Sequence, residues 1–170
     1  MGRDGECLGK LGPLHRVGTL VQLTEVEPYD DGRFDIQVIG RQRLRVTESD
    51  NSGPFLRGEV ELLPDEDEPD AVTEAQRTLA TFETYREALS EMRGGPVLAG
   101  EMPSDPAYLS YALASTCLLT LPQRQALLEA ESARERLGML RRTLHEEMRA
   151  MRALPSLPAT EVARTRWSPN

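Results

Sequence analysis

The feature that most constrains the fold is an alternation of apolar and polar side chains between residues 17 and 48. The apolar members of this pattern stand at every second position and are Phe34, Ile36, Val38, Leu44 and Val46. Because successive side chains of a β-strand point to opposite faces of a sheet, a period of two predicts strands. We expect three short antiparallel strands in this stretch, with the apolar side chains, Phe34 included, on one buried face.

Glycines divide the alternating stretch into its expected strands. Asp31-Gly32 is a strong hairpin signal, since glycine accepts a positive φ without steric cost. Gly40 is predicted to serve the next turn in the same way. A further strand is expected over residues 55–63, where apolar side chains again alternate with charged ones.

The second half of the chain carries helical signals. Residues 64–70, PDEDEPD, form an acidic segment bounded by prolines, which we interpret as a solvated linker. The expected organisation is a β subdomain at 1–63, the linker at 64–70, a helical lobe at 71–152 and a flexible tail at 153–170. The predicted fold class is therefore α+β, an antiparallel sheet followed by about four helices.

Capping residues mark where these helices are expected to begin. The signals are Asp70 or Thr73, Asp105, Thr120 and Ser132. The sequence Gly94-Gly95-Pro96 is predicted to end the first helix. Apolar residues at spacings of three and four predict the buried faces. In the first helix they are Val72, Ala75, Leu79, Phe82 and Leu89, and in the last Leu137, Leu140, Leu144, Met148 and Met151.

Composition excludes several classes of function. The net charge of −8 disfavours nucleic acids and anionic membranes, because both attract positive surfaces. No apolar run approaches the roughly 20 residues of a membrane-spanning helix, and the first residues lack a signal-peptide core. The two cysteines, Cys7 and Cys117, give neither a zinc spacing nor a disulfide framework. A cytoplasmic location is expected.

Catalytic motifs are not recognisable in the sequence. Gly9-Lys10 contains the only lysine but lacks the hydroxyl residue that completes a phosphate-binding loop. His15 and His145 have no nucleophile and orienting carboxylate near them in a catalytic pattern. Cys117 lies on a predicted apolar helix face and is interpreted as a core residue. We expect a protein without enzymatic activity, cofactor or metal.

One family carries the same pattern of glycines and arginines. The residues concerned are Gly18, Thr19, Asp31, Gly32, Arg33, Gly40, Arg41, Arg43, Leu44 and Val46, followed by the strand and the helical half. Over residues 17–148 the chain resembles the amino-terminal substrate-binding domain of Lon proteases. The resemblance implies a PUA-like sheet or partial barrel and a role in recognising polypeptides. It also implies a stand-alone form, because the ATPase and peptidase modules of Lon are not found in this sequence.

The amino terminus departs from that family, which usually begins with a Pro-Leu-Phe-Pro-like strand that is not found here. We therefore expect the first strands of the family's sheet to be missing, through a shortened fragment or gene start. A sheet without these neighbours would expose unpaired backbone groups at an edge strand. This predicts homo-oligomer formation through the exposed edge.

The leading functional hypothesis is recognition of unfolded or degron-bearing polypeptide, and the expected contact surface contains Tyr29, Arg41, Arg43 and Phe55. An adaptor that docks on a separate ATPase or protease is the first alternative. The second is a PUA-like RNA-binding module that uses the arginines of residues 41–45, with Arg43 and Arg45 on the solvent face. Residues 1–63 hold 8 basic and 11 acidic side chains, and Glu59 and Glu61 alternate on the following strand, so cross-strand Arg–Glu pairs account for these arginines more simply.

Overall fold

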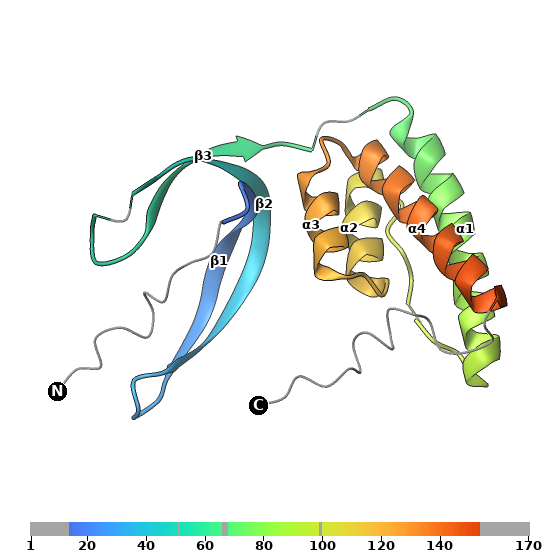
Figure 1. The fold of residues 1–170 in the computed structure, drawn as a ribbon, viewed down its shortest axis with the longest axis horizontal. Coiled ribbons are helices and arrows are strands. Elements are labelled where there is room, and N and C mark those ends of the chain that lie inside the picture. Colours follow the sequence, from blue (N-terminus) through green and yellow to red (C-terminus); the bar gives the residue numbers. More distant parts are fainter. Residues whose placement is uncertain (1–13, 51, 66–67, 99, 154–170) are drawn as a thin grey trace. The chain divides into compact units, whose positions relative to one another are not determined.

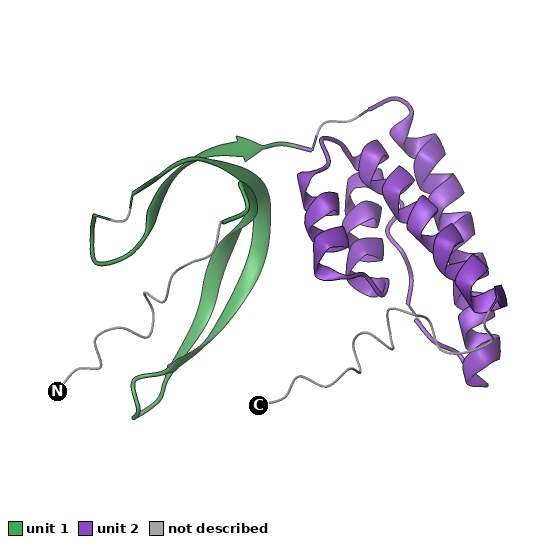
Figure 2. Ribbon diagram, viewed as in Figure 1, with its two compact units in different colours: residues 1–64 green, residues 65–170 purple. Residues whose placement is uncertain are grey.

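The computed structural model describes residues 14–50, 52–65, 68–98 and 100–153. In this part of the chain a three-stranded antiparallel sheet is followed by four helices, which confirms the predicted α+β class (Figure 1). The elements are β1 (Val17–Pro28), β2 (Phe34–Asp50), β3 (Arg57–Leu63), α1 (Ala71–Arg93), α2 (Pro106–Thr116), α3 (Leu121–Glu129) and α4 (Ala133–Ala153). The chain divides after Pro64 into a sheet unit and a helical unit (Figure 2).

The sheet has the order β1-β2-β3, so β2 is central and β1 and β3 are edge strands. The turn between β1 and β2 forms where it is predicted: Gly32 has φ +85°, and the amide of Tyr29 donates to the carbonyl oxygen of Arg33 (2.9 Å). The pairing then runs from Pro28 opposite Phe34 to Val17 opposite Arg45.

The predicted turn at Gly40 is wrong. β2 is one continuous strand of 17 residues, and Gly40 lies inside it, opposite Val21. The β1–β2 pairing has two irregularities, one at Thr24 of β1 between the pairs of Leu23 and Glu25, and one next to Gly40. At the second, Leu20 pairs with Gln42 and Val21 with Gly40, which leaves Arg41 as the extra residue of a β-bulge. A bulge bends the strand without ending it, so the glycine–arginine pair marks a bend and not a turn.

The expected single buried face of the sheet is also wrong. Phe34, predicted to be a core residue, is 61% exposed, and Ile36 and Val38 are exposed as well. In the sheet unit, Val17 and Arg43 are the buried residues among those described. The alternation correctly predicts the strands, but the described residues of the sheet unit supply no second layer to cover their apolar side chains.

The helices begin and end close to the predicted signals. Asp105 accepts a hydrogen bond from the amide of Tyr108 (2.9 Å), Thr120 and Gln123 form a capping box, and Ser132 accepts from the amide of Glu135 (3.2 Å). Gly94 ends α1 with φ +70°. At the first helix the alternative start at Thr73 is wrong, because α1 begins after Asp70.

The helical unit is built around a core between α1, α2 and α4. The buried face of α4 is the predicted one, Leu137, Leu140, Leu144, Met148 and Met151. On α1 the prediction is displaced: Val72 is exposed, and Thr78 and Tyr85 are buried beside Ala75, Phe82 and Leu89. Cys117 is buried in this core, as predicted.

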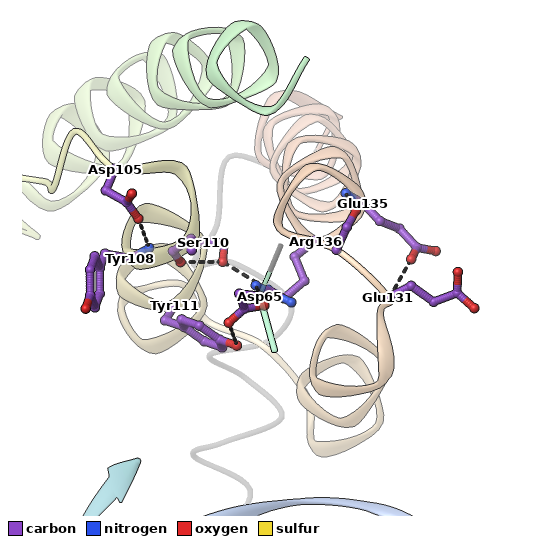
Figure 3. A network of polar contacts seen from close by, with 10 residues as sticks. Asp65, Asp105, Tyr108, Ser110, Tyr111, Glu131, Glu135 and Arg136 are labelled. Carbon is purple, nitrogen blue, oxygen red and sulfur yellow. Dashed lines mark hydrogen bonds and ion pairs between the residues drawn. The ribbon is translucent and has the colours of Figure 1, made fainter. Parts of the chain in front are cut away.

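A charged cluster lies inside the helical unit (Figure 3). Arg136 of α4 is 1% exposed; its Nε donates to Ser110 Oγ (3.0 Å) and its Nη2 to Asp65 Oδ1 (2.5 Å). Tyr111 stacks on the guanidinium at 4.5 Å and donates its hydroxyl to Asp65 Oδ2 (2.6 Å). We call Asp65, Ser110, Tyr111 and Arg136 the arginine cluster. Asp65, predicted to be part of a solvated linker, is instead tied to α2 and α4.

Candidate functional site

The hairpin formed by β1 and β2 presents one apolar face. Residues directly opposite each other on paired strands point to the same side, and the register places Val26 opposite Ile36 and Leu23 opposite Val38. The hairpin face consists of Val21, Leu23, Val26, Phe34, Ile36 and Val38, each between 45% and 61% exposed. Exposed apolar residues that form a continuous group, unlike scattered ones, are typical of interaction surfaces.

The reverse side of the same hairpin is acidic. Glu27 pairs with Asp35 and Glu25 with Gln37, and the Gln37 amide donates to the Glu25 carboxylate. The hairpin is therefore amphipathic, with apolar side chains on one face and carboxylates on the other.

The bulge at Arg41 moves the apolar side chains to the opposite face. Leu20 and Val21 are neighbours on β1 and so point to opposite sides. Their partners Gln42 and Gly40 must then also point to opposite sides, although they are two residues apart. Beyond the bulge, the apolar residues of what we call the three-strand face are Leu20, Leu44, Val46, Val60 and Leu62, all exposed or half-buried.

The four residues predicted to form a contact surface are not brought together. Tyr29 lies at the turn before β2 and Phe55 in the connection after it, at opposite ends of the longest strand (Figure 1). Both are exposed, and an arginine lies over each ring. The Cζ atom of Arg33 is 5.4 Å from the centroid of the Tyr29 ring, and that of Arg57 is 4.9 Å from the centroid of the Phe55 ring. Asp35 accepts a hydrogen bond from the Tyr29 hydroxyl (2.6 Å) and raises the pKa of that phenol.

The predicted arginines differ from one another in their surroundings. Arg41 is exposed and donates from Nε to the side chain of Gln22 on β1 (2.9 Å). Arg43 is 4% exposed, so its prediction as a solvent-facing residue is wrong. Arg45 pairs with Glu61 across the strands (2.9 Å), which confirms the predicted Arg–Glu pair.

Reactive groups do not converge in the described residues. No cluster of three or more His, Cys, Asp or Glu side chains that could hold a metal occurs among them. Burial raises the pKa of the Cys117 thiol to about 12, which keeps it protonated and a poor nucleophile. His145 is exposed on α4. Cys7 and Lys10 lie outside the described residues.

Comparison with known proteins identifies the family of this chain. The family model of the ATP-dependent protease La (LON) substrate-binding domain matches residues 4–146, which is most of the sequence. The chain belongs to the Lon substrate-binding domain family. The predicted resemblance to Lon amino-terminal domains is thereby confirmed.

Curated relatives include Lon protease 2 of Herpetosiphon aurantiacus, 27% identical over 137 residues, and the Lon protease of Desulfovibrio desulfuricans, 29% identical over 139 residues. Each match covers 79% of this chain but only 17% and 16% of the relative, so the chain spans about a sixth of these Lon proteases.

A solved structure supports the fold of this Lon domain. The N-terminal domain of the Mycobacterium avium complex Lon protease has a TM-score of 0.57 at 24% identity, covering 81% of this chain and 74% of that one. No helix in the described part of the chain combines the length and apolar composition that crossing a membrane requires.

Proposed function

We propose that the sheet unit recognises unfolded or degron-bearing segments of other polypeptides, without catalysing a reaction on them. The observation that carries the proposal is the hairpin face: six exposed apolar side chains on one side of a hairpin, in a member of a substrate-binding domain family. Unfolded chains expose the apolar side chains that folded proteins bury. Contact with the hairpin face would remove both surfaces from water, which stabilises the complex by about 25 cal/mol per Å² of apolar area.

The strand edges supply a second kind of contact. β1 and β3 each have one edge that no other strand pairs among the described residues. Such an edge has free backbone N–H and C=O groups and can accept an extended segment as an additional strand. Backbone pairing does not depend on the identity of the segment's side chains, which suits a domain that accepts many clients.

Of the predicted contact residues, Tyr29, Arg41 and Phe55 remain part of this proposal. All three are exposed: Tyr29 precedes β2, Arg41 lies within it and Phe55 follows it. A client that contacts all three would therefore have to lie along the strand. Arg43 is buried, and we assign it no direct contact.

The proposal is tested by binding of reduced, carboxymethylated lactalbumin, a permanently unfolded protein, to the purified chain. The variant Ile36→Ser with Val38→Ser removes two side chains from the hairpin face, and we expect its dissociation constant to rise about tenfold. Leu121→Ser is the matched control, because Leu121 is 82% exposed but lies on α3. Equal binding by the double variant and the control would overturn the proposal.

The same mixture tests the absence of catalysis. We expect lactalbumin to stay intact on a gel after long incubation, with and without ATP and magnesium; cleavage would contradict a recognition-only role. If the chain instead captures one ATPase or protease in fixed stoichiometry and ignores unfolded lactalbumin, it is an adaptor. A cytoplasmic location is part of this proposal.

A further inference from the structure

A groove runs between α1 and α4 on the helical unit. The two helices lie side by side in Figure 1, and the hydroxyl of Thr78 on α1 donates to the carbonyl oxygen of Leu137 on α4 (3.2 Å). The groove is open, has a volume of about 410 Å³, and is lined by Thr81, Thr84, His145, Met148, Arg149 and Arg152, with Ala80 beside them. We call it the basic groove.

The charge of the groove is positive and is not neutralised within the described residues. His145, Arg149 and Arg152 follow one another at spacings of four and three, which places them on one side of α4. None of the residues that line the groove is acidic, and no hydrogen bond or ion pair joins these three side chains to another described residue.

Neighbouring arginines of the same helix are engaged. Arg141 donates from Nε to Glu74 on α1 (2.8 Å), and Arg136 binds Asp65 in the arginine cluster. Arg149 and Arg152 have no such carboxylate partner among the described residues. This is a local positive surface on a chain whose net charge is −8.

The threonines add hydrogen-bond acceptors opposite the cations. The Thr81 hydroxyl donates to the carbonyl oxygen of Arg77 (3.0 Å), and the Thr84 hydroxyl donates to that of Ala80 (3.1 Å). Because both hydroxyl hydrogens are donated to backbone carbonyl oxygens of α1, the two hydroxyl oxygens can only accept hydrogen bonds from a ligand. The groove thus offers cationic donors on α4 and neutral acceptors on α1.

We propose that the basic groove docks an acidic segment of a partner polypeptide. Carboxylates of such a segment would bind the guanidinium groups of Arg149 and Arg152, since the planar fork of arginine matches a carboxylate. Its backbone N–H groups would donate to the threonine oxygens. A nucleic acid backbone has phosphates but no comparable N–H donors, and the net negative charge of the chain repels a long polyanion.

This site is separate from the hairpin face. It lies wholly within the helical unit and uses charge where the hairpin face uses apolar contact. The two proposals can therefore fail independently of each other.

The test measures binding of a fluorescein-labelled twelve-residue peptide rich in Glu and Asp by anisotropy. The comparison peptide carries Gln and Asn at the same positions. We expect the acidic peptide alone to bind, with an affinity that falls as salt is added. Arg149→Gln combined with Arg152→Gln should weaken binding about tenfold.

Arg134→Gln is the matched control, because Arg134 is exposed in the first turn of α4 and does not line the groove. It should change the affinity by less than about twofold. If the control and the groove variants lost affinity equally, the effect would come from the overall charge of the protein, and the proposal would be overturned. Tighter binding of a twelve-nucleotide single-stranded RNA than of the peptide would assign the groove to nucleic acid instead. Ile36→Ser with Val38→Ser should bind the acidic peptide normally, which separates this site from the hairpin face.

Discussion

The guanidinium of Arg136 lies in the interior of the helical unit, and its Nη1 is buried without a hydrogen-bond partner among the described residues. Burying a cation is unfavourable unless it is paired, and Asp65 and Ser110 satisfy only part of its donors. Asp65 is 22% exposed at its side chain, so the carboxylate keeps some solvation of its own. The pair is therefore asymmetric, and the arginine depends on the aspartate more than the aspartate depends on the arginine.

This asymmetry predicts the stability of three variants. Asp65→Ala leaves a buried cation without its anion and should lower the free energy of unfolding by about 3–5 kcal/mol. Arg136→Met replaces the cation with an apolar chain of similar length and should cost about 1–3 kcal/mol. The double variant should be more stable than Asp65→Ala alone, because it removes the unpaired charge. Chemical denaturation followed by circular dichroism measures all three.

Arg134→Met is the control for this series, since Arg134 is exposed on the same helix, and it should change the free energy of unfolding by less than about 0.5 kcal/mol. A double variant less stable than both single variants would show that the cluster stabilises the fold by something other than charge pairing.

At the scale of elements, the bulge at Arg41 decides which way the apolar side chains of β2 point. In a regular strand of this sequence, Phe34, Ile36, Val38, Leu44 and Val46 would all lie on one face, as their even spacing predicts. With the bulge, the first three belong to the hairpin face and the last two to the three-strand face. One residue thus divides a single apolar stripe between two sides of the sheet.

Deleting Arg41 tests this assignment. The deletion makes Gly40 and Gln42 neighbours opposite Val21 and Leu20, so the shortened strand can pair regularly with β1 on both sides of it. We expect hydrogen-exchange protection to be kept in residues 17–28 and in residues 34–50. Arg41→Ala is the matched control, because it keeps the chain length and loses only the bond to Gln22. Loss of protection in residues 17–20 with 42–50, or in residues 21–28 with 34–40, would show that Arg41 is not the extra residue of this bulge.

The local signals of the sequence predict most elements correctly, and the failures involve contacts between distant residues. Asp105, Thr120 and Ser132 act within their own turns, so the sequence alone identifies these helix starts. The bulge depends on how β2 pairs with β1, which Gly40 alone cannot reveal. The burial of Arg136 depends on Asp65, 71 residues away, and no periodicity in the sequence marks that pair.

The sequence predicts the type of candidate site but not the residues that form it. An alternating strand with arginines and glycines indicates the correct family, and hence the substrate-recognition role that the family supports. The particular residues were harder to predict: Arg43 is buried, Tyr29 and Phe55 lie far apart along the strand, and Phe34, predicted for the core, is among the most exposed apolar residues. Exposure depends on what covers a sheet, which a strand's own sequence does not record.

At the scale of the whole molecule, the described residues of the sheet unit do not cover its two apolar faces or its two outer strand edges, while the helical unit has a core of its own. Apolar groups of this extent associate in water when no client is present. We therefore predict that the chain self-associates, with a sedimentation coefficient that rises across roughly a hundredfold range of concentration. Phe34→Ser with Ile36→Ser should shift this association to higher concentration, whereas Tyr108→Ser, which removes a 71% exposed side chain from α2, should not. A chain that sediments as a monomer throughout would contradict self-association through the hairpin face and through the strand edges alike.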